Sequence, residues 1–209
     1  MHMQDARNSN YRSLTISDLE PMAQVLAQSF EEDPLVAFIL PNQKTRVKTV
    51  SKFFRAMGRI NIQNNMAFGV SEPLEGVAIW NFPNQPKIPA TPKDLLTFIP
   101  LLLSSYPFGA QRARALFQQN EAMHKKYASE PHFYLDNLGV LPSARGKGLS
   151  SRLIRPFLEM ADSQKVIAYT ETVTRANVPL YEHFGFQCVE ESYIPGMSLT
   201  LFALLRAVH

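Results

Sequence analysis

Two glycines and two cations stand together at residues 145–148, where the chain passes from a strand into a helix. The sequence Arg-Gly-Lys-Gly at these positions follows an apolar run that ends at Val140 and precedes an amphipathic run that begins at Leu149. Glycine lets backbone amides approach a ligand closely, and the first amides of a helix have no partners within that helix. The helix dipole and the two side-chain charges favour an anion at the same point. The segment is therefore a candidate site for a diphosphate.

Three other kinds of segment could contain the same glycines. A solvated basic turn that uses glycine only for its shape would have the same composition. A P-loop is excluded, because it needs Gly-Lys-Ser/Thr and Lys147 is followed by Gly148. A dinucleotide-binding turn needs Gly-x-Gly-x-x-Gly, and the third glycine position is occupied by Ser151. The missing third glycine makes the dinucleotide interpretation weak.

A wider stretch around this loop resembles the cofactor segment of the GNAT N-acetyltransferase superfamily. That family shows Gln/Arg-x-x-Gly-x-Gly/Ala after a strand that ends in Val-x-Pro, and Arg145, Gly148 and Ser150 occupy its three defined positions. Ser150 departs from the usual glycine or alanine but is still small, so we expect the cradle to survive with slightly less room. A second segment, 177–186, resembles the family's short helix that opens on asparagine and closes with Tyr-x-x-x-Gly-Phe. The resemblance covers about 133–190.

The resemblance implies acetyl-CoA as cosubstrate, with no metal ion, and a direct transfer to an amine. In that family the strand before the glycine loop separates from its neighbour, and its backbone binds the pantetheine arm and the oxyanion. Gly139 would ease a bulge there, although it can also be an ordinary strand glycine beside a turn. The residues expected to hold acetyl-CoA are Leu138, Gly139, Val140, Arg145, Gly146, Lys147, Gly148, Leu149, Ser150, Ser151 and Asn177.

Two side chains of the second segment receive roles from the resemblance. Tyr181 occupies the position of the residue that protonates the coenzyme A thiolate, although an aromatic residue on a short helix is often core with a polar tip. Asn177 would hydrogen-bond the pantetheine arm. It would also suit the N-cap of the helix that it opens, and both roles can hold at once.

The base that takes the proton of the ammonium group has two candidates. His132, Tyr134 and Asp136 alternate along one predicted strand and so share a face, with Asp136 nearest the expected separation. Glu171 lies on the neighbouring predicted strand. Either carboxylate can instead bind the substrate cation or serve in a structural hydrogen bond, and transfer through water needs neither. His124, His132 and His183 show no metal-ligand spacing.

The periodicity of apolar residues predicts the elements that must position these groups. Strands are expected at 11–16, 66–71, 75–82, 133–140, 166–173, 187–194 and 197–205, and helices at 19–30, 35–40, 44–62, 92–104, 109–128, 149–162 and 177–184. They predict an α/β fold with a mixed, mostly antiparallel sheet of six to seven strands, a central βαβ unit, flanking helices and a helical insertion before the fourth strand. We expect one domain over 1–209, with a loop and helical insertion at about 84–131 and an acetyl-CoA-binding core at 132–190.

Bulk composition narrows the classes of function. The chain has 209 residues, 45% of them hydrophobic, and a net charge of +3 from scattered cations, which argues against nucleic acid. The most apolar run, 95–103, is too short for a membrane span. The single cysteine, Cys188, excludes an intrachain disulfide, and the polar first ten residues are unlike a signal peptide. The expected location is the cytoplasm.

Three functions were compared on this basis. The first is an acetyltransferase that acts on a small-molecule or protein amine, with homodimer formation as an option. The second is a catalytically degenerate relative that binds acyl-CoA as a sensor or interaction module. The third is a nucleotide-cofactor enzyme of the dinucleotide type. The presence of both Tyr181 and Asn177 favours the first function over the second.

Overall fold

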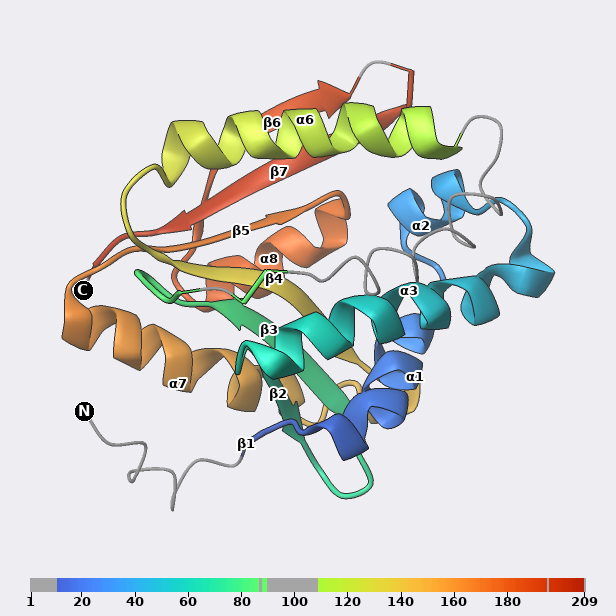
Figure 1. Cartoon of the computed structure of the whole chain (residues 1–209). Helices are drawn as coiled ribbons and strands as arrows, with labels where there is room; N and C mark the ends of the chain where they lie inside the picture. The colour runs from blue at the N-terminus through green and yellow to red at the C-terminus, as the bar shows by residue number, and fades with distance from the viewer. Residues whose placement is uncertain (1–10, 87, 90–108, 195, 209) are drawn as a thin grey trace.

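The computed structural model describes residues 11–86, 88–89, 109–194 and 196–208. Helices and strands alternate from residue 109 to residue 194, whereas three helices follow one another near the N-terminus (Figure 1). In chain order they are β1 (Arg12–Ser13), a 3-10 turn (Ile16–Asp18), α1 (Leu19–Ser29), α2 (Pro34–Ile39), α3 (Gln43–Gln63), β2 (Ala67–Val70), β3 (Gly76–Asn81), α6 (Gly109–Tyr127), β4 (Phe133–Val140), a 3-10 turn (Pro142–Ala144), α7 (Leu149–Gln164), β5 (Ala168–Thr172), a 3-10 turn (Arg175–Asn177), α8 (Val178–His183), β6 (Gln187–Ile194) and β7 (Leu199–Arg206).

The strands form a seven-stranded sheet in the order β1-β2-β3-β4-β5-β7-β6. All neighbouring pairs are antiparallel except β4 and β5, which are parallel and are connected through α7. This arrangement confirms the predicted mixed sheet with its central βαβ unit. The helix expected at 109–128 is α6 and precedes the fourth strand, whereas the helix expected at 92–104 lies outside the described residues.

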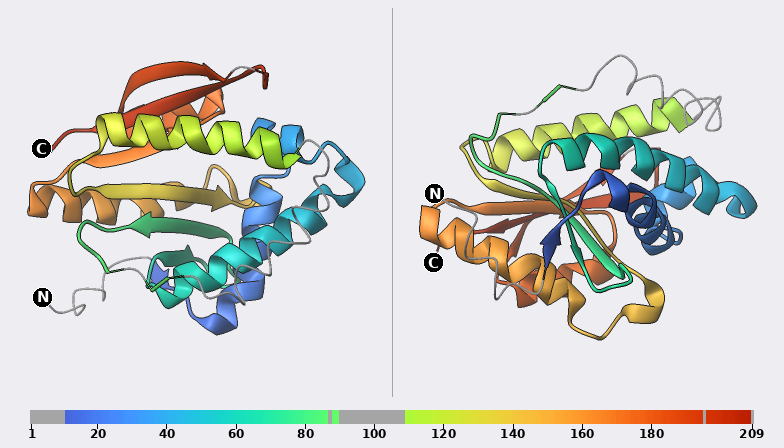
Figure 2. Two further views of the ribbon diagram at one scale, coloured as in Figure 1. Left: turned by 45° about the horizontal axis from the view of Figure 1, so that its top comes forward. Right: turned by 60° about the horizontal axis from the view of Figure 1, so that its bottom comes forward.

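Helices cover both faces of the sheet (Figure 2). On one face, α7 and α8 pack over a cluster that contains Trp80, Phe133, Leu135 and Phe157. On the other face, α1 and α3 pack over β2 and β3, and α6 packs over β5 and β7. We call these the α7 face and the α6 face. Apolar side chains therefore alternate between two buried layers along each central strand, as a sheet covered on both sides requires.

The position of α7 is fixed by contacts with the centre of the sheet. The Trp80 indole is fully buried and its Nε1 donates to the backbone oxygen of Leu153 at 3.0 Å. The same indole stacks on Phe157 with ring centroids 5.2 Å apart. A buried indole N–H is satisfied in this way while its ring contributes apolar contact. These contacts hold the first turn of α7, and with it the glycine loop, at the end of β4.

Strands β4 and β5 separate beyond their first residues. Their parallel pairing joins Phe133–Leu135 to Ala168–Thr170, and the register includes no residue of β4 after Leu135. The last pair is held by Thr170, whose buried hydroxyl donates to the backbone oxygen of Leu135 at 2.8 Å. The described part of β4 from 136 to 140 thus has no β5 partner, and the sheet is open at this point.

A bulge in β4 lies at the start of this opening. Against β3, Leu135 pairs with Trp80 and Asn137 pairs with Ile79, so Asp136 is the extra residue. The insertion shifts the alternation, and Leu138 as well as Leu135 therefore packs on the α7 face. The expectation that Gly139 marks the bulge is wrong. A Cβ at Gly139 would stand 2.9 Å from Leu26 Cδ2 and 3.0 Å from Ser29 Cβ, so α1 approaches this glycine closely and a larger residue would force α1 side chains to shift.

None of the helices in the described part of the chain combines the length and the apolar character that a membrane span requires.

Candidate active site

The glycine loop has the backbone geometry of an anion-binding turn. Gly146 and Gly148 adopt φ values of +79° and +75°, in the left-handed region that side chains disfavour. No heavy atom lies within 4 Å of where a Cβ would stand at either position, so conformation and not crowding requires glycine. Gly148 is the N-cap residue of α7 and no side chain caps the helix. The first amides of a 16-residue helix are therefore available to an anion.

Both cations of the loop are exposed, but each already has a partner within the chain. Arg145 Nη2 donates to the backbone oxygen of Ser29, the last residue of α1, at 3.4 Å. Lys147 Nζ lies 3.3 Å from Glu75 Oε1, and its side chain is 55% exposed. An exposed ion pair of this kind is worth little, so Lys147 can turn toward a diphosphate at small cost. The end of α1 is thereby placed beside the loop.

The three residues that follow the loop form the first turn of α7. Leu149 is buried in the cluster on the α7 face and anchors the turn. Ser150 and Ser151 are half-buried, and the Ser151 hydroxyl accepts from Arg155 Nε at 2.9 Å. The predicted cradle of 145–151 is thus one continuous surface turn directly beyond β4.

Tyr181 lies at the opening between β4 and β5, on the α7 face. Its ring packs in the buried cluster, 5.9 Å from the Phe186 ring, and the residue is 7% exposed. Burial raises the pKa of Tyr181 to about 12, while a hydrogen bond with the Thr170 hydroxyl opposes the shift. The phenol therefore stays protonated at neutral pH and is a hydrogen-bond donor beside the opening.

Asn177 occupies the N-cap position of α8 without capping it. No side-chain cap hydrogen bond is formed, and Asn177 Nδ2 instead donates to Thr172 Oγ1 at 3.3 Å. The capping role expected for Asn177 is wrong, because a short 3-10 turn precedes α8 and leaves Asn177 with helical backbone angles. The side chain faces the end of β5, where the sheet is open.

Asp33 is a site residue that sequence reasoning missed. Its Oδ1 accepts from the amides of Leu35 and Val36 at the start of α2, and its Oδ2 accepts from Thr174 Oγ1 at 3.2 Å. Burial raises the pKa of Asp33, and its charge contributes to the raised pKa of Tyr181. In the sequence, the Asp-Pro pair indicates the start of a helix. No local pattern indicates that the Asp33 side chain contacts the segment that follows β5.

Both carboxylates predicted as bases lie close to one another on the α6 face. Glu171 is on β5 with its side chain 5% exposed, and burial raises its pKa to about 7. The neighbouring hydroxyls of Tyr134 and Tyr169 oppose this shift, and the charge of Asp136 adds to it. A carboxylate with a pKa near neutrality is suited to accept a proton at physiological pH. Glu171 is the stronger candidate for the base.

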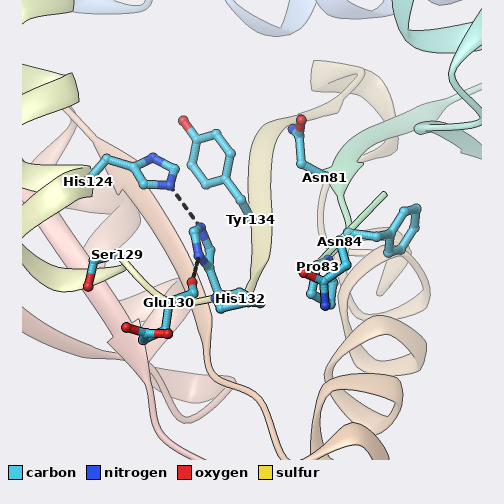
Figure 3. Close-up of a pocket in the computed structure, with 10 residues that line it drawn as sticks. Asn81, Pro83, Asn84, His124, Ser129, Glu130, His132 and Tyr134 are labelled. Atoms are coloured by element: carbon cyan, nitrogen blue, oxygen red, sulfur yellow. Dashed lines mark hydrogen bonds between the residues drawn. The ribbon is translucent and has the colours of Figure 1, made fainter. Parts of the chain in front are cut away.

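A pocket of about 320 Å³ opens beside these carboxylates, where α6 ends and β4 begins (Figure 3). Asn81, His124, His132 and Tyr134 are among its lining residues. A second cavity of about 280 Å³ lies between α3 and the end of β3 and shares Asn81 with the first. Both cavities lie toward the α6 face, on the side of the sheet opposite Tyr181.

The two histidines of this pocket were not predicted to belong to the site. His124 Nε2 and His132 Nε2 lie 2.8 Å apart, although α6 carries one residue and the segment before β4 carries the other. His124 Nδ1 lies 3.6 Å from Glu171 Oε1. Sequence spacing could not reveal this, because α6 must first pack across β4 and β5. Within the described residues, no group of three or more His, Cys, Asp or Glu side chains could hold a metal ion.

Comparison with known proteins supplies independent information. Residues 111–186 match the model of the acetyltransferase (GNAT) family. An uncharacterised N-acetyltransferase of Schizosaccharomyces pombe is 22% identical over 191 residues, which cover 85% of this chain and 74% of the relative. A histone acetyltransferase HPA2-related acetyltransferase from Corynebacterium glutamicum has a TM-score of 0.60 at 19% identity, covering 95% of this chain and 96% of that one. The Drosophila melanogaster polyamine N-acetyltransferase, which forms N-acetylagmatine, has a TM-score of 0.60 at 14% identity, covering 95% and 99%.

The sheet with its open centre has the fold of these acetyltransferases, and the matched segment carries the acetyltransferase (GNAT) sequence pattern. Residues 111–186 are thus matched to the acetyltransferase (GNAT) family, and most of the chain is similar to an N-acetyltransferase of that kind. The matched residues run from α6 through β4, α7 and β5 to Phe186, and so include the glycine loop, Glu171 and Tyr181.

Proposed function

We propose that this enzyme transfers the acetyl group of acetyl-CoA directly to an amine. One observation carries the proposal. An uncapped helix start with two left-handed glycines lies at the end of the strand that separates from β5. An anion site and an open sheet in this order suit a cosubstrate that has a diphosphate at one end and a thioester at the other.

The chain's own residues divide the work as follows. The α7 amides and Arg145 hold the diphosphate, and the backbone of 138–140 offers hydrogen bonds to the pantetheine arm and to the carbonyl oxygen that becomes negative. Tyr181 donates a hydrogen bond to the departing sulfur on the α7 face. Glu171 removes the proton of the attacking amine on the α6 face. Bound acetyl-CoA supplies the thioester carbonyl that the amine attacks.

A small amine cation suits the acceptor side of the sheet. Glu171 lies 3.6 Å from His124, which lines the first pocket, and Asp136 adds a second carboxyl group near Glu171. A carboxylate attracts an ammonium group before it acts as base. The fruit-fly relative with the same fold acts on a polyamine-type substrate. A small-molecule amine is therefore favoured over a protein amine.

A panel of amines with acetyl-CoA tests the proposal through release of free thiol. Agmatine, an arylalkylamine and a lysine-containing peptide represent the acceptor classes. We expect turnover with at least one small amine and formation of its N-acetyl product by mass spectrometry. Tight binding of coenzyme A without turnover on the whole panel would support a sensor instead, and no binding of coenzyme A would remove the proposal.

Replacing Gly148 with alanine tests the anion site itself. The left-handed backbone at Gly148 costs an alanine roughly 1–2 kcal/mol, and a shifted turn misaligns the α7 amides. We expect coenzyme A to bind the variant about 10-fold more weakly, which equals about 1.4 kcal/mol. Thermal unfolding with and without coenzyme A reports this as a smaller ligand-induced stabilisation.

Gly196 provides the matched control for this measurement. It has a φ of +78° and equally open surroundings, but it lies in the turn between β6 and β7 and not at the start of α7. Gly196→Ala should lower the unfolding temperature of the free protein by a similar amount and leave the stabilisation by coenzyme A unchanged. Equal stabilisation of both variants by coenzyme A would place the diphosphate elsewhere.

A further inference from the structure

A row of polar groups leads from Glu171 to the pocket at the end of α6. Figure 3 shows its outer part, in which His124 contacts His132 and His132 contacts Glu130. Glu171 Oε1 lies 3.6 Å from His124 Nδ1, and His124 Nε2 lies 2.8 Å from His132 Nε2. His132 Nδ1 lies 2.7 Å from the backbone oxygen of Glu130. Side-chain exposure rises from 5% at Glu171 to 27% at His124. The row thus connects a buried carboxyl group to a pocket that both histidines line.

The direction of the hydrogen bonds in this row follows from its fixed end. A backbone oxygen can only accept, so His132 Nδ1 carries a proton and donates to Glu130. In neutral His132 the other nitrogen, Nε2, is then an acceptor, and His124 Nε2 must donate to it. Neutral His124 therefore presents an unprotonated Nδ1 to Glu171. At 3.6 Å the two atoms are just beyond hydrogen-bond distance, so proton transfer between them requires a small approach of the two side chains or one bridging water.

The surroundings of the row are polar and partly unsatisfied. Asn120 Oδ1 is buried without a hydrogen-bond partner among the described residues, whereas the hydroxyls of Tyr134 and Tyr169 stabilise the Glu171 carboxylate as hydrogen-bond donors. The titratable or charged groups that face Glu171 and the two histidines come from α6, β4, β5 and β6, and they are His124, Tyr127, His132, Tyr134, Asp136, Tyr169 and Glu190. Lys126 on α6 adds one amino cation, whose Nζ donates to Glu190 Oε2 at 2.6 Å and whose side chain is 61% exposed. Glu130 adds a carboxylate that lines the pocket. This ammonium group next to the set is thus paired with a carboxylate and directed toward solvent.

We propose that His124 and His132 relay the proton of the acceptor amine from Glu171 to solvent. This inference rests on the proposed function, in which Glu171 accepts that proton. The carboxyl proton of Glu171 passes to His124 Nδ1, and His124 Nε2 releases its own proton to His132 Nε2. The His132 imidazolium then gives one proton to solvent in the pocket. The net result is one proton moved from the amine to solvent. The two imidazoles are again neutral, with their protons on the opposite nitrogens, and reorientation of both rings restores the resting tautomers before the next turnover.

Chemical rescue of a His132→Ala variant tests the relay. The substitution leaves a space next to the open pocket, which a small base can enter. With the best acceptor of the amine panel we expect kcat to fall about 10-fold or more, with an unchanged KM for acetyl-CoA. Added imidazole should restore kcat in proportion to the concentration of its neutral form. Pyrazole, which has a similar size but is hardly basic, should not restore kcat. His183→Ala is the control, because His183 lies exposed on α8, away from the row.

A lost structural contact would behave differently. If kcat of folded His132→Ala is unchanged, or is lowered but not restored by imidazole, the relay is wrong. His124→Gln is the second variant: it keeps a polar side chain that cannot take up a proton, and it should lower kcat without rescue, since His124 lies deeper. Full activity of folded His124→Gln would also overturn the relay.

Histidine tautomers in the unliganded wild-type protein give a readout that needs no turnover. Side-chain nitrogen NMR above pH 8 should show His132 protonated at Nδ1 and His124 protonated at Nε2. A proton on His124 Nδ1 would reverse the row and refute the relay. An inactive enzyme with the expected tautomers would instead remove the proposed function while leaving the hydrogen-bond order intact.

Discussion

Replacing Tyr181 with phenylalanine is expected to lower kcat about 100-fold while the KM for acetyl-CoA changes by less than about twofold. The change removes one hydroxyl group and keeps the ring, which packs in the cluster on the α7 face. Loss of a single donor to a developing anion in other enzymes costs about 100- to 1,000-fold in kcat. Steady-state kinetics with the best acceptor of the amine panel, with acetyl-CoA varied, measures both constants.

Tyr11→Phe is the matched control for this experiment. Tyr11 packs against the same buried cluster, with its ring 5.0 Å from Phe157, but it lies just before β1, far from the opening in the sheet. We expect its kcat to equal that of the wild type. A Tyr181→Phe enzyme with wild-type kcat would remove Tyr181 from the mechanism, and an equal loss in both variants would point to the core.

The pKa of Tyr181 indicates what kind of help the phenol gives. Burial raises this pKa to about 12, whereas an unperturbed thiol has a pKa of about 8.5. Complete transfer of the phenolic proton to a thiolate is therefore uphill. Because the phenol has a higher pKa than the thiol, Tyr181 is better described as a hydrogen-bond donor that keeps its proton. It stabilises the sulfur as negative charge develops there. The kcat of the wild type should then show no decline assignable to Tyr181 below about pH 10.

Local signals in the sequence predicted the cosubstrate side of the site well. The strand expected at 133–140 has those bounds in the structure, and the helix after the glycine loop begins at Leu149 as expected. Gly146 and Gly148 have the left-handed backbone that a glycine-rich anion turn suggests. These features depend on residues close in sequence, where turn chemistry and apolar periodicity are informative.

The acceptor side of the site depends on contacts between distant segments, and the sequence could not predict them. His124 meets His132 and Glu171 only because α6 packs across β4 and β5. The bulge at Asp136 is set by the register of β3 against β4. No residue type in either strand indicates that register. Gly139 was assigned to the bulge because glycine often marks one, whereas the approach of α1 decides its identity.

Glu171→Gln is expected to lower kcat/KM about 100-fold or more and to remove the acidic limb of its pH profile. In the wild type the rate should rise with pH through about 7, as the carboxyl group loses its proton. Asp136→Asn separates the two carboxylates. The charge of Asp136 helps to raise the pKa of Glu171, so this variant should stay active with its acidic limb moved to lower pH. If instead Asp136→Asn loses the limb and Glu171→Gln retains it, Asp136 is the base.

Glu171→Gln should also make the protein more stable at alkaline pH. Burial raises the folded-state pKa of Glu171 from an ordinary value of 4.5 to about 7, so the folded protein holds that proton more tightly than the unfolded chain. The contribution of Glu171 to the free energy of unfolding is then fully present below pH 4.5. It is lost as the pH rises through about 7, by about 3 kcal/mol in total. Urea unfolding at pH 8 should show Glu171→Gln to be more stable by up to this amount.

Exposed Glu121 on α6 provides the control, because Glu121→Gln should change neither kcat/KM nor the pH dependence of stability by a comparable amount. A Glu171→Gln variant that is less stable than the wild type at pH 8 would contradict the burial of a charged carboxylate. A stabilised but inactive variant would indicate that this family member keeps a costly buried acid because the acceptor amine must lose its proton there. The loss of activity and the gain of stability would then have one cause.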